Sequence, residues 1–135
     1  IVNKAEALLG QDLAGNNLTL LGLTFKAHTD DLRNSPAIEV AKRLAAKGTT
    51  LTAYDPMVKS ESGIPQEIRL ATSMEQALTG SDLALILTEW PEFARANWAG
   101  FINTMNEPRV VDARNALDRK KMVELGYLYD DLGRT

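Results

Sequence analysis

The densest group of chemically useful side chains lies in residues 22–33, which read GLTFKAHTDDLR. Lys26 can bring a point charge to a phosphate, and Arg33 can present a planar fork to a second phosphate or to a carboxylate. The alternative is that both cations only pair with Asp30 and Asp31, as charges close in sequence commonly do. The residues by themselves leave these two interpretations open.

A second candidate for anion binding is Arg114, which follows the apolar run that ends at Asp112. A solvated surface arginine is the alternative at this position. Two or three cations that converge on one rim would favour a diphosphate or a nucleotide sugar over a neutral ligand. A small anionic ligand is therefore compatible with this chain if the fold brings the two segments together.

The residues that several other kinds of site require are rare or missing in this sequence. His28 is the only histidine and there is no cysteine, so we expect no metal site, no thiol nucleophile and no disulfide. Asp30 and Asp31 are adjacent, so we expect them to cap the following helix and pair with Arg33 rather than act as paired catalytic carboxylates. The chain has neither G-x-G-x-x-G nor a P-loop. Its 18 acidic against 15 basic residues argue against a nucleic-acid surface.

The elements that must position these side chains alternate between strand and helix. Short apolar or β-branched runs predict strands, and longer segments with helical spacing predict helices. This alternation predicts an α/β fold, a Rossmann-like three-layer sandwich with a mostly parallel sheet of five or six strands. The expected strands are Asn17–Leu23, Thr49–Tyr54, Ile68–Ala71, Leu83–Leu87, Arg109–Asp112 and Tyr127–Tyr129, and the expected helices are Lys4–Leu9, Pro36–Lys47, Ser73–Leu78 and Ala116–Leu125.

Capping residues mark the ends of two of these helices. Ser35 can serve as the N-cap with Pro36 at the first helical position, and Gly48 can follow the last turn. Ser73 is expected to cap the next helix together with Gln76, three residues further on.

In an open parallel sheet, ligands bind outside the carboxyl ends of the strands. Trp90 and Phe93 follow the most apolar strand and are three residues apart, so we expect them at a strand end rather than mid-core, packed on one face of a helical turn. The loops expected at the carboxyl ends are 24–34, 55–63, 88–95 and 113–115.

The length of 135 residues predicts a single domain over residues 1–135, with residues 1–16 as a leading helix and linker. No window approaches the roughly 18 consecutive apolar residues of a membrane span, and the first residues lack the pattern of a secretory signal. The chain begins with Ile1 rather than Met, which predicts a fragment of a longer polypeptide.

Four separated motifs resemble the C-terminal domain of the UDP-glucose/GDP-mannose dehydrogenase family. The resemblance extends from about Asn17 to Tyr129, and within the family two motifs are most similar to the UDP-glucose 6-dehydrogenase branch. The motifs are GLTFKxxTDDxRxSPA over 22–37, AYDP over 53–56, TEWPEF over 88–93 and VDARN over 111–115.

The resemblance implies that this chain is the UDP-binding domain of a longer oxidoreductase. Members oxidise the C6 alcohol of a nucleotide sugar, in that branch UDP-glucose to UDP-glucuronate, in two NAD-dependent steps through a cysteine-bound thiohemiacetal and thioester. An N-terminal Rossmann domain binds NAD, and a central helical region carries the cysteine and the dimer contact. We therefore expect no catalytic residue here and no activity of this domain alone. The whole enzyme would be a cytoplasmic homodimer or larger assembly, without nucleic-acid or membrane partners.

By motif position, Phe25, Lys26 and Arg114 would contact the UDP-sugar, and Arg33 would reach the NAD that the N-terminal domain mainly holds. One departure is Ala113, where the family has glycine. A Cβ at this position requires a backbone without positive φ, or a shifted Arg114. The alternatives are a GDP-mannose or UDP-N-acetylmannosamine dehydrogenase domain, or a non-enzymatic nucleotide-binding module.

Overall fold

The computed structural model of this chain describes residues 14–24, 35–58 and 64–131. In these ranges no helix is long and apolar enough to cross a membrane, and no three His, Cys, Asp or Glu side chains gather as a metal site. Several expectations fall outside the described residues: the helix Lys4–Leu9, and the loop residues Phe25, Lys26, His28, Asp30, Asp31 and Arg33.

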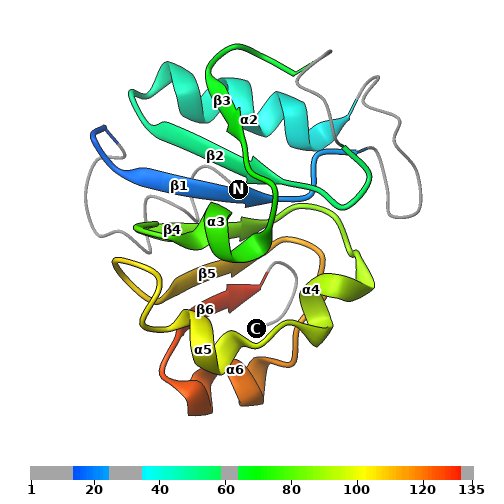
Figure 1. Ribbon diagram of the computed structural model, residues 1–135, viewed down its shortest axis with the longest axis vertical. Coiled ribbons are helices and arrows are strands. Elements are labelled where there is room, and N and C mark those ends of the chain that lie inside the picture. Colours follow the sequence, from blue (N-terminus) through cyan, green and yellow to red (C-terminus); the bar gives the residue numbers. More distant parts are fainter. Residues whose placement is uncertain (1–13, 25–34, 59–63, 132–135) are drawn as a thin grey trace.

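Six strands form one sheet in the order β3-β2-β1-β4-β5-β6 (Figure 1), and all five pairings are parallel. The chain order reverses between β1 and β4, as it does in doubly wound dinucleotide-binding folds. The expected α/β architecture is confirmed. The strands are β1 (Asn17–Leu21), β2 (Thr50–Tyr54), β3 (Ile68–Leu70), β4 (Leu83–Ile86), β5 (Arg109–Asp112) and β6 (Leu128–Asp131).

Helices cover the sheet on both faces. Successive side chains of a strand point to opposite faces, so Leu20 and Leu85 belong to one buried cluster and Leu21 and Ile86 to the other. The first cluster is covered by α2 (Pro36–Ala46). The second is covered by α3 (Met74–Leu78), α4 (Pro91–Arg95), α5 (Trp98–Phe101) and α6 (Arg119–Leu125).

The capping predictions hold in part. Ser35 and Pro36 occupy the predicted positions at the start of α2, but the Ser35 hydroxyl makes no cap and donates instead to the Leu23 carbonyl at 2.6 Å. The Ser73 hydroxyl does cap α3, accepting from the Gln76 N–H at 3.1 Å. The Ser35 hydroxyl thus links the start of α2 to the segment after β1 instead of capping the helix.

In the second half of the chain, the ends of one helix and one strand differ from those predicted. The last helix begins at Arg119 and not at Ala116, because the Asp118 carboxylate caps it by accepting from the Lys121 N–H at 3.3 Å. The last strand is β6, shifted by one residue at its start and extended to Asp131. The two short helices α4 and α5 were not predicted as separate elements.

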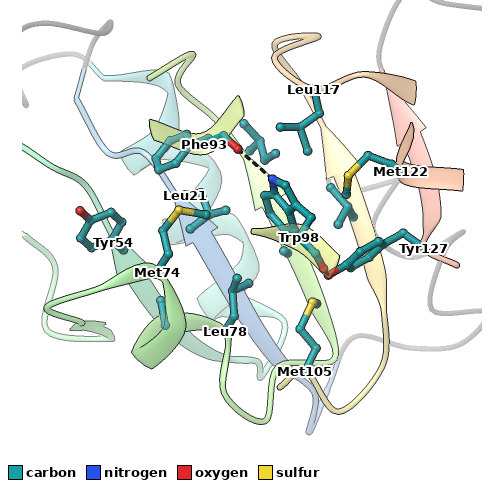
Figure 2. Close-up of a cluster of buried hydrophobic side chains, with 14 of the residues drawn as sticks. Leu21, Tyr54, Met74, Leu78, Phe93, Trp98, Met105, Leu117, Met122 and Tyr127 are labelled. Atoms are coloured by element: carbon teal, nitrogen blue, oxygen red, sulfur yellow. Dashed lines mark hydrogen bonds between the residues drawn. The ribbon is translucent and has the colours of Figure 1, made fainter. Parts of the chain in front are cut away.

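Trp90 and Phe93 follow β4 at the strand end and are packed, as expected, but both are buried members of the core cluster, so the expectation that they are not mid-core was wrong. Phe93 is fully buried, because α4 turns it back onto the sheet, where it meets the Tyr54 ring edge-on with 6.4 Å between ring centroids. The Trp98 indole N–H donates to the Phe93 carbonyl at 2.8 Å, and its ring meets Tyr127 edge-on (Figure 2). The core therefore reaches up to the ends of the strands that carry the candidate site.

Candidate functional site

The carboxyl ends of the parallel strands meet at one edge of the sheet, here called the carboxyl edge. Its segments are residues 22–24, 55–58, 87–90 and 113–117, which follow β1, β2, β4 and β5. Ladder hydrogen bonds continue past the strand ends: the Leu87 N–H donates to the Leu21 carbonyl at 2.9 Å. In this strand order, ligands bind at the carboxyl edge where the order reverses, between β1 and β4.

Asp55 lies at the centre of this edge and is 1% exposed. Its Oδ2 accepts hydrogen bonds from the backbone N–H groups of Leu23 at 2.8 Å and Thr24 at 3.2 Å. The same oxygen accepts from the Trp90 indole N–H at 3.2 Å, while Oδ1 accepts from the Met57 N–H at 2.9 Å. One buried carboxylate therefore joins the segments that follow β1, β2 and β4.

Gly22 and Thr88 close the gap between β1 and β4. Gly22 has a φ of +98°, and a Cβ added there would lie 2.5 Å from the Cβ and Oγ1 of Thr88. Thr88 is itself 1% exposed, and its hydroxyl donates to the Thr24 carbonyl at 3.3 Å. The two strand ends are thus in direct contact.

The pyrophosphate of NAD does not fit at this turn. In dinucleotide-binding folds the backbone N–H groups after the first strand donate to the pyrophosphate, and glycines let it approach. Here the N–H groups of Leu23 and Thr24 already donate to Asp55, and Thr88 fills the space beside Gly22. A ligand of the carboxyl edge must therefore lie outside this layer of residues.

Arg114 projects from the carboxyl edge beyond β5. Its Nε donates to Oε2 of Glu89 at 2.6 Å, and both side chains are 42% exposed. Exposed ion pairs contribute little free energy, typically up to about 1 kcal/mol. Glu89 therefore sets the direction of the guanidinium without binding it tightly, and the guanidinium remains accessible to an anion.

The backbone beneath Arg114 is fixed by Asp112, which is fully buried. Its Oδ1 accepts from the Arg114 N–H at 3.1 Å, and its Oδ2 accepts from the Tyr129 hydroxyl at 2.7 Å. The turn takes its positive φ, 54°, at Asn115 and not at Ala113. Ala113 therefore accommodates its Cβ without strain, in place of the glycine that the resemblance implies.

A tyrosine and a carboxylate meet beside this edge. The Tyr54 hydroxyl donates to Glu92, with 2.8 and 2.9 Å to the two carboxylate oxygens. Burial, the hydrogen bond to Glu92 and the negative charges of Glu92 and Asp55 raise the pKa of Tyr54 to about 12. The hydroxyl thus stays protonated at neutral pH and links the end of β2 to α4.

A separate open groove of about 490 Å³ lies between α3 and the α4–α5 pair. It is lined by Met74, Glu75, Glu92, Arg95, Ala96 and Phe101. Its lining holds two carboxylates against one guanidinium, an excess of negative charge that disfavours an anionic diphosphate.

Of the four predicted binding residues, the described part of the chain contains Arg114, and it lies at the expected edge. Phe25, Lys26 and Arg33 lie outside the described residues. Sequence reasoning missed Asp55, whose signal is an aspartate directly after an apolar strand and before a proline. It also missed the donor role of the Trp90 indole.

Comparison with known proteins agrees with this geometry. Residues 19–119 match the UDP-glucose/GDP-mannose dehydrogenase family, UDP binding domain. The UDP-glucose 6-dehydrogenase of Rickettsia felis is 38% identical over 136 residues, a match that covers 98% of this chain and 30% of that protein. The chain thus spans about a third of the length of the curated relatives it matches.

Solved dehydrogenase structures share the fold. A UDP-glucose dehydrogenase from Pyrobaculum islandicum matches with a TM-score of 0.77 at 27% identity, covering 96% of this chain and 28% of that one. A UDP-D-ManNAc dehydrogenase from Pyrococcus horikoshii matches with a TM-score of 0.80 at 26% identity, covering 98% and 29%. From the strand order, the carboxyl edge and these matches together, the chain belongs to the UDP-glucose/GDP-mannose dehydrogenase family, as a UDP-binding domain of that family.

Proposed function

We propose that this chain is the C-terminal, UDP-binding domain of a UDP-glucose 6-dehydrogenase, which oxidises UDP-glucose to UDP-glucuronate with NAD. The observation that carries the proposal is Arg114, an accessible cation held at the carboxyl edge of a UDP-binding domain. The 38% identity to a UDP-glucose 6-dehydrogenase supports the choice of sugar.

In this proposal Arg114 binds the nucleotide sugar. Glu89 contacts its Nε, so the Nη groups at the other side of the planar fork can donate to phosphate oxygens. Because the Arg114–Glu89 ion pair is exposed, weakening it when an anion binds Arg114 costs little free energy. The guanidinium is thereby oriented before the ligand arrives, which lowers the entropic cost of binding.

The remaining contacts of the proposal rest on the family motif over residues 22–37. Phe25 and Lys26 would contact the UDP-sugar, and Arg33 would reach the NAD. Other parts of the enzyme would hold most of the cofactor and the catalytic cysteine, in keeping with a first turn that does not fit a pyrophosphate. Assembly as a homodimer or larger oligomer and a cytoplasmic location belong to the same proposal.

The test uses the complete enzyme that contains this chain, supplied with NAD and one nucleotide sugar at a time. We expect NADH formation with UDP-glucose and much slower formation with UDP-N-acetylmannosamine or GDP-mannose. Preference for UDP-N-acetylmannosamine would favour the activity of the Pyrococcus horikoshii relative instead. No NADH with any of the three would contradict the enzymatic proposal and favour a nucleotide-binding module.

The role of Arg114 is tested by Arg114→Ala in the same enzyme. Loss of charge-assisted hydrogen bonds predicts a KM for UDP-glucose raised roughly 10- to 100-fold. The matched control is Arg43→Ala, because Arg43 also pairs with a glutamate, at 3.6 Å from Glu39, but on the exposed face of α2. An equal KM in both variants would remove Arg114 from the site.

A further inference from the structure

The proposed function assigns no role to the buried carboxylate of Asp55. Its Oδ2 lies among four donors: the N–H groups of Leu23 and Thr24, the Thr24 hydroxyl at 3.3 Å and the Trp90 indole N–H. Three of these donors belong to the turn after β1, where related folds hold a phosphate. Asp55 therefore supplies from within the chain the negative charge that a ligand supplies elsewhere.

We propose that Asp55 is a positioning residue for the nucleotide sugar, acting as a built-in anion that fixes the carboxyl edge beneath the ligand. The inference rests on the proposed function, because it concerns the same site. It adds that Asp55 contacts no ligand itself. Its effect on binding passes through the segments that its carboxylate holds.

One of these segments leads to Arg114. Asp55 binds the Trp90 indole, Trp90 follows Glu89, and Glu89 Oε2 lies 2.6 Å from Arg114 Nε. Thr88, just before Glu89, is in turn bonded to the Thr24 carbonyl. A shift of the Trp90 segment therefore moves the acceptor that orients the guanidinium.

The second segment is the turn after β1. Its N–H groups at Leu23 and Thr24 are buried and donate to Asp55, so removing the carboxylate takes this acceptor away in a place that is closed to solvent. Two outcomes are open to the turn: it rearranges, or a small anion takes the vacated position. The second outcome gives the proposal a chemical test.

The experiment compares Asp55→Ala and Asp55→Asn in the complete enzyme. For Asp55→Ala we expect the KM for UDP-glucose and the Kd for UDP to rise roughly tenfold or more, because small displacements of binding groups cost that much. The KM for NAD should change by less than about twofold, since in the proposed function other parts of the enzyme hold most of the cofactor. Added sodium formate should lower the Kd for UDP again, because formate can fill the position of the lost carboxylate.

Asp55→Asn keeps the proposal testable if the alanine variant does not fold. Asparagine has the same shape as aspartate, and its carbonyl oxygen can still accept from the four donors around Oδ2. Its amide nitrogen then faces the Met57 N–H, which loses its acceptor. We therefore expect a smaller rise in the Kd for UDP than in Asp55→Ala. The matched control is Thr19→Val, which removes a buried hydrogen bond from Thr19 to the Ala77 carbonyl, away from the carboxyl edge. It should destabilise the fold and leave the Kd for UDP unchanged.

The outcomes separate this inference from the proposed function. If Asp55→Asn and any folded Asp55→Ala bind UDP as Thr19→Val does, the positioning role of Asp55 is overturned while the dehydrogenase proposal stands. If the unaltered enzyme binds UDP but does not oxidise UDP-glucose, the proposed function fails, and the Kd series still decides the role of Asp55. If the unaltered enzyme binds no UDP, both fail.

Discussion

Gly22→Ala tests the closed contact between the ends of β1 and β4. The added Cβ would lie 2.5 Å from two side-chain atoms of Thr88 and 2.8 Å from its backbone nitrogen. Thr88 cannot turn away, because its backbone follows β4 and its side chain is buried. The substitution also places a side chain at a φ of +98°, which only glycine adopts easily.

The expected loss of stability has two parts. The left-handed backbone costs about 1 to 2 kcal/mol for a residue with a Cβ. Overpacking a filled site costs about 1 to 3 kcal/mol more. The free energy of unfolding should therefore fall by about 2 to 5 kcal/mol, which corresponds to a urea midpoint lowered by roughly 1 to 2 M for a small domain.

The assay is urea unfolding of the 135-residue chain followed by tryptophan fluorescence. Gly15→Ala and Gly80→Ala are matched controls, because these glycines have φ values of +81° and +73°, and no heavy atom of the described residues lies within 4 Å of an added Cβ. They should lose only the backbone part, about 1 to 2 kcal/mol. An equal loss at all three glycines would refute the closed contact and reopen the space between β1 and β4 to a ligand.

Three further predictions concern the stability of the same chain. Burial, the largest cause for both residues, raises the pKa of Tyr54 and Tyr127 to about 12 from the ordinary tyrosine value of 10.0. The unfolded chain therefore ionises first, so the free energy of unfolding should hold below pH 10 and fall between about pH 10 and 12; urea midpoints that stay constant over this window would contradict it. Ser73→Ala removes the cap of α3 and should cost about 1 kcal/mol by urea unfolding, and no loss would show that the cap is unimportant. Phe93→Ala empties a fully buried site and should cost about 3 to 5 kcal/mol; a loss below that of Ser73→Ala would contradict its place in the core.

The sheet was predictable because its signals are local. Each strand is a short apolar run, and β4 is apolar along its whole length because both of its faces are buried. Pro36 and Gly48 mark the ends of α2, because proline favours the first helical position and glycine favours the positive φ that follows a helix. Both residue types can be recognised in a single sequence. The start of α6 was misplaced because Asp118 caps a helix that begins only at Arg119.

The candidate site was predictable only where a charged side chain follows a strand directly. Arg114 is such a case. The role of Asp55 was not, because its donors Leu23, Thr24 and Trp90 lie 31 to 35 residues away in sequence and meet only after three strands pair. The burial of Trp90 was missed for a related reason: its position after a strand does not reveal the hydrogen bond that its indole donates to Asp55, 35 residues away.

The most direct measurement is the crystal structure of the complete enzyme with UDP-glucose bound. We expect the diphosphate outside the carboxyl ends of β1, β4 and β5, within hydrogen-bonding distance of the Arg114 guanidinium. The N–H groups of Leu23 and Thr24 should still donate to Asp55. A nucleotide in the groove between α3 and α4, or a phosphate bound by those two N–H groups in place of Asp55, would show that the UDP site lies elsewhere than at Arg114.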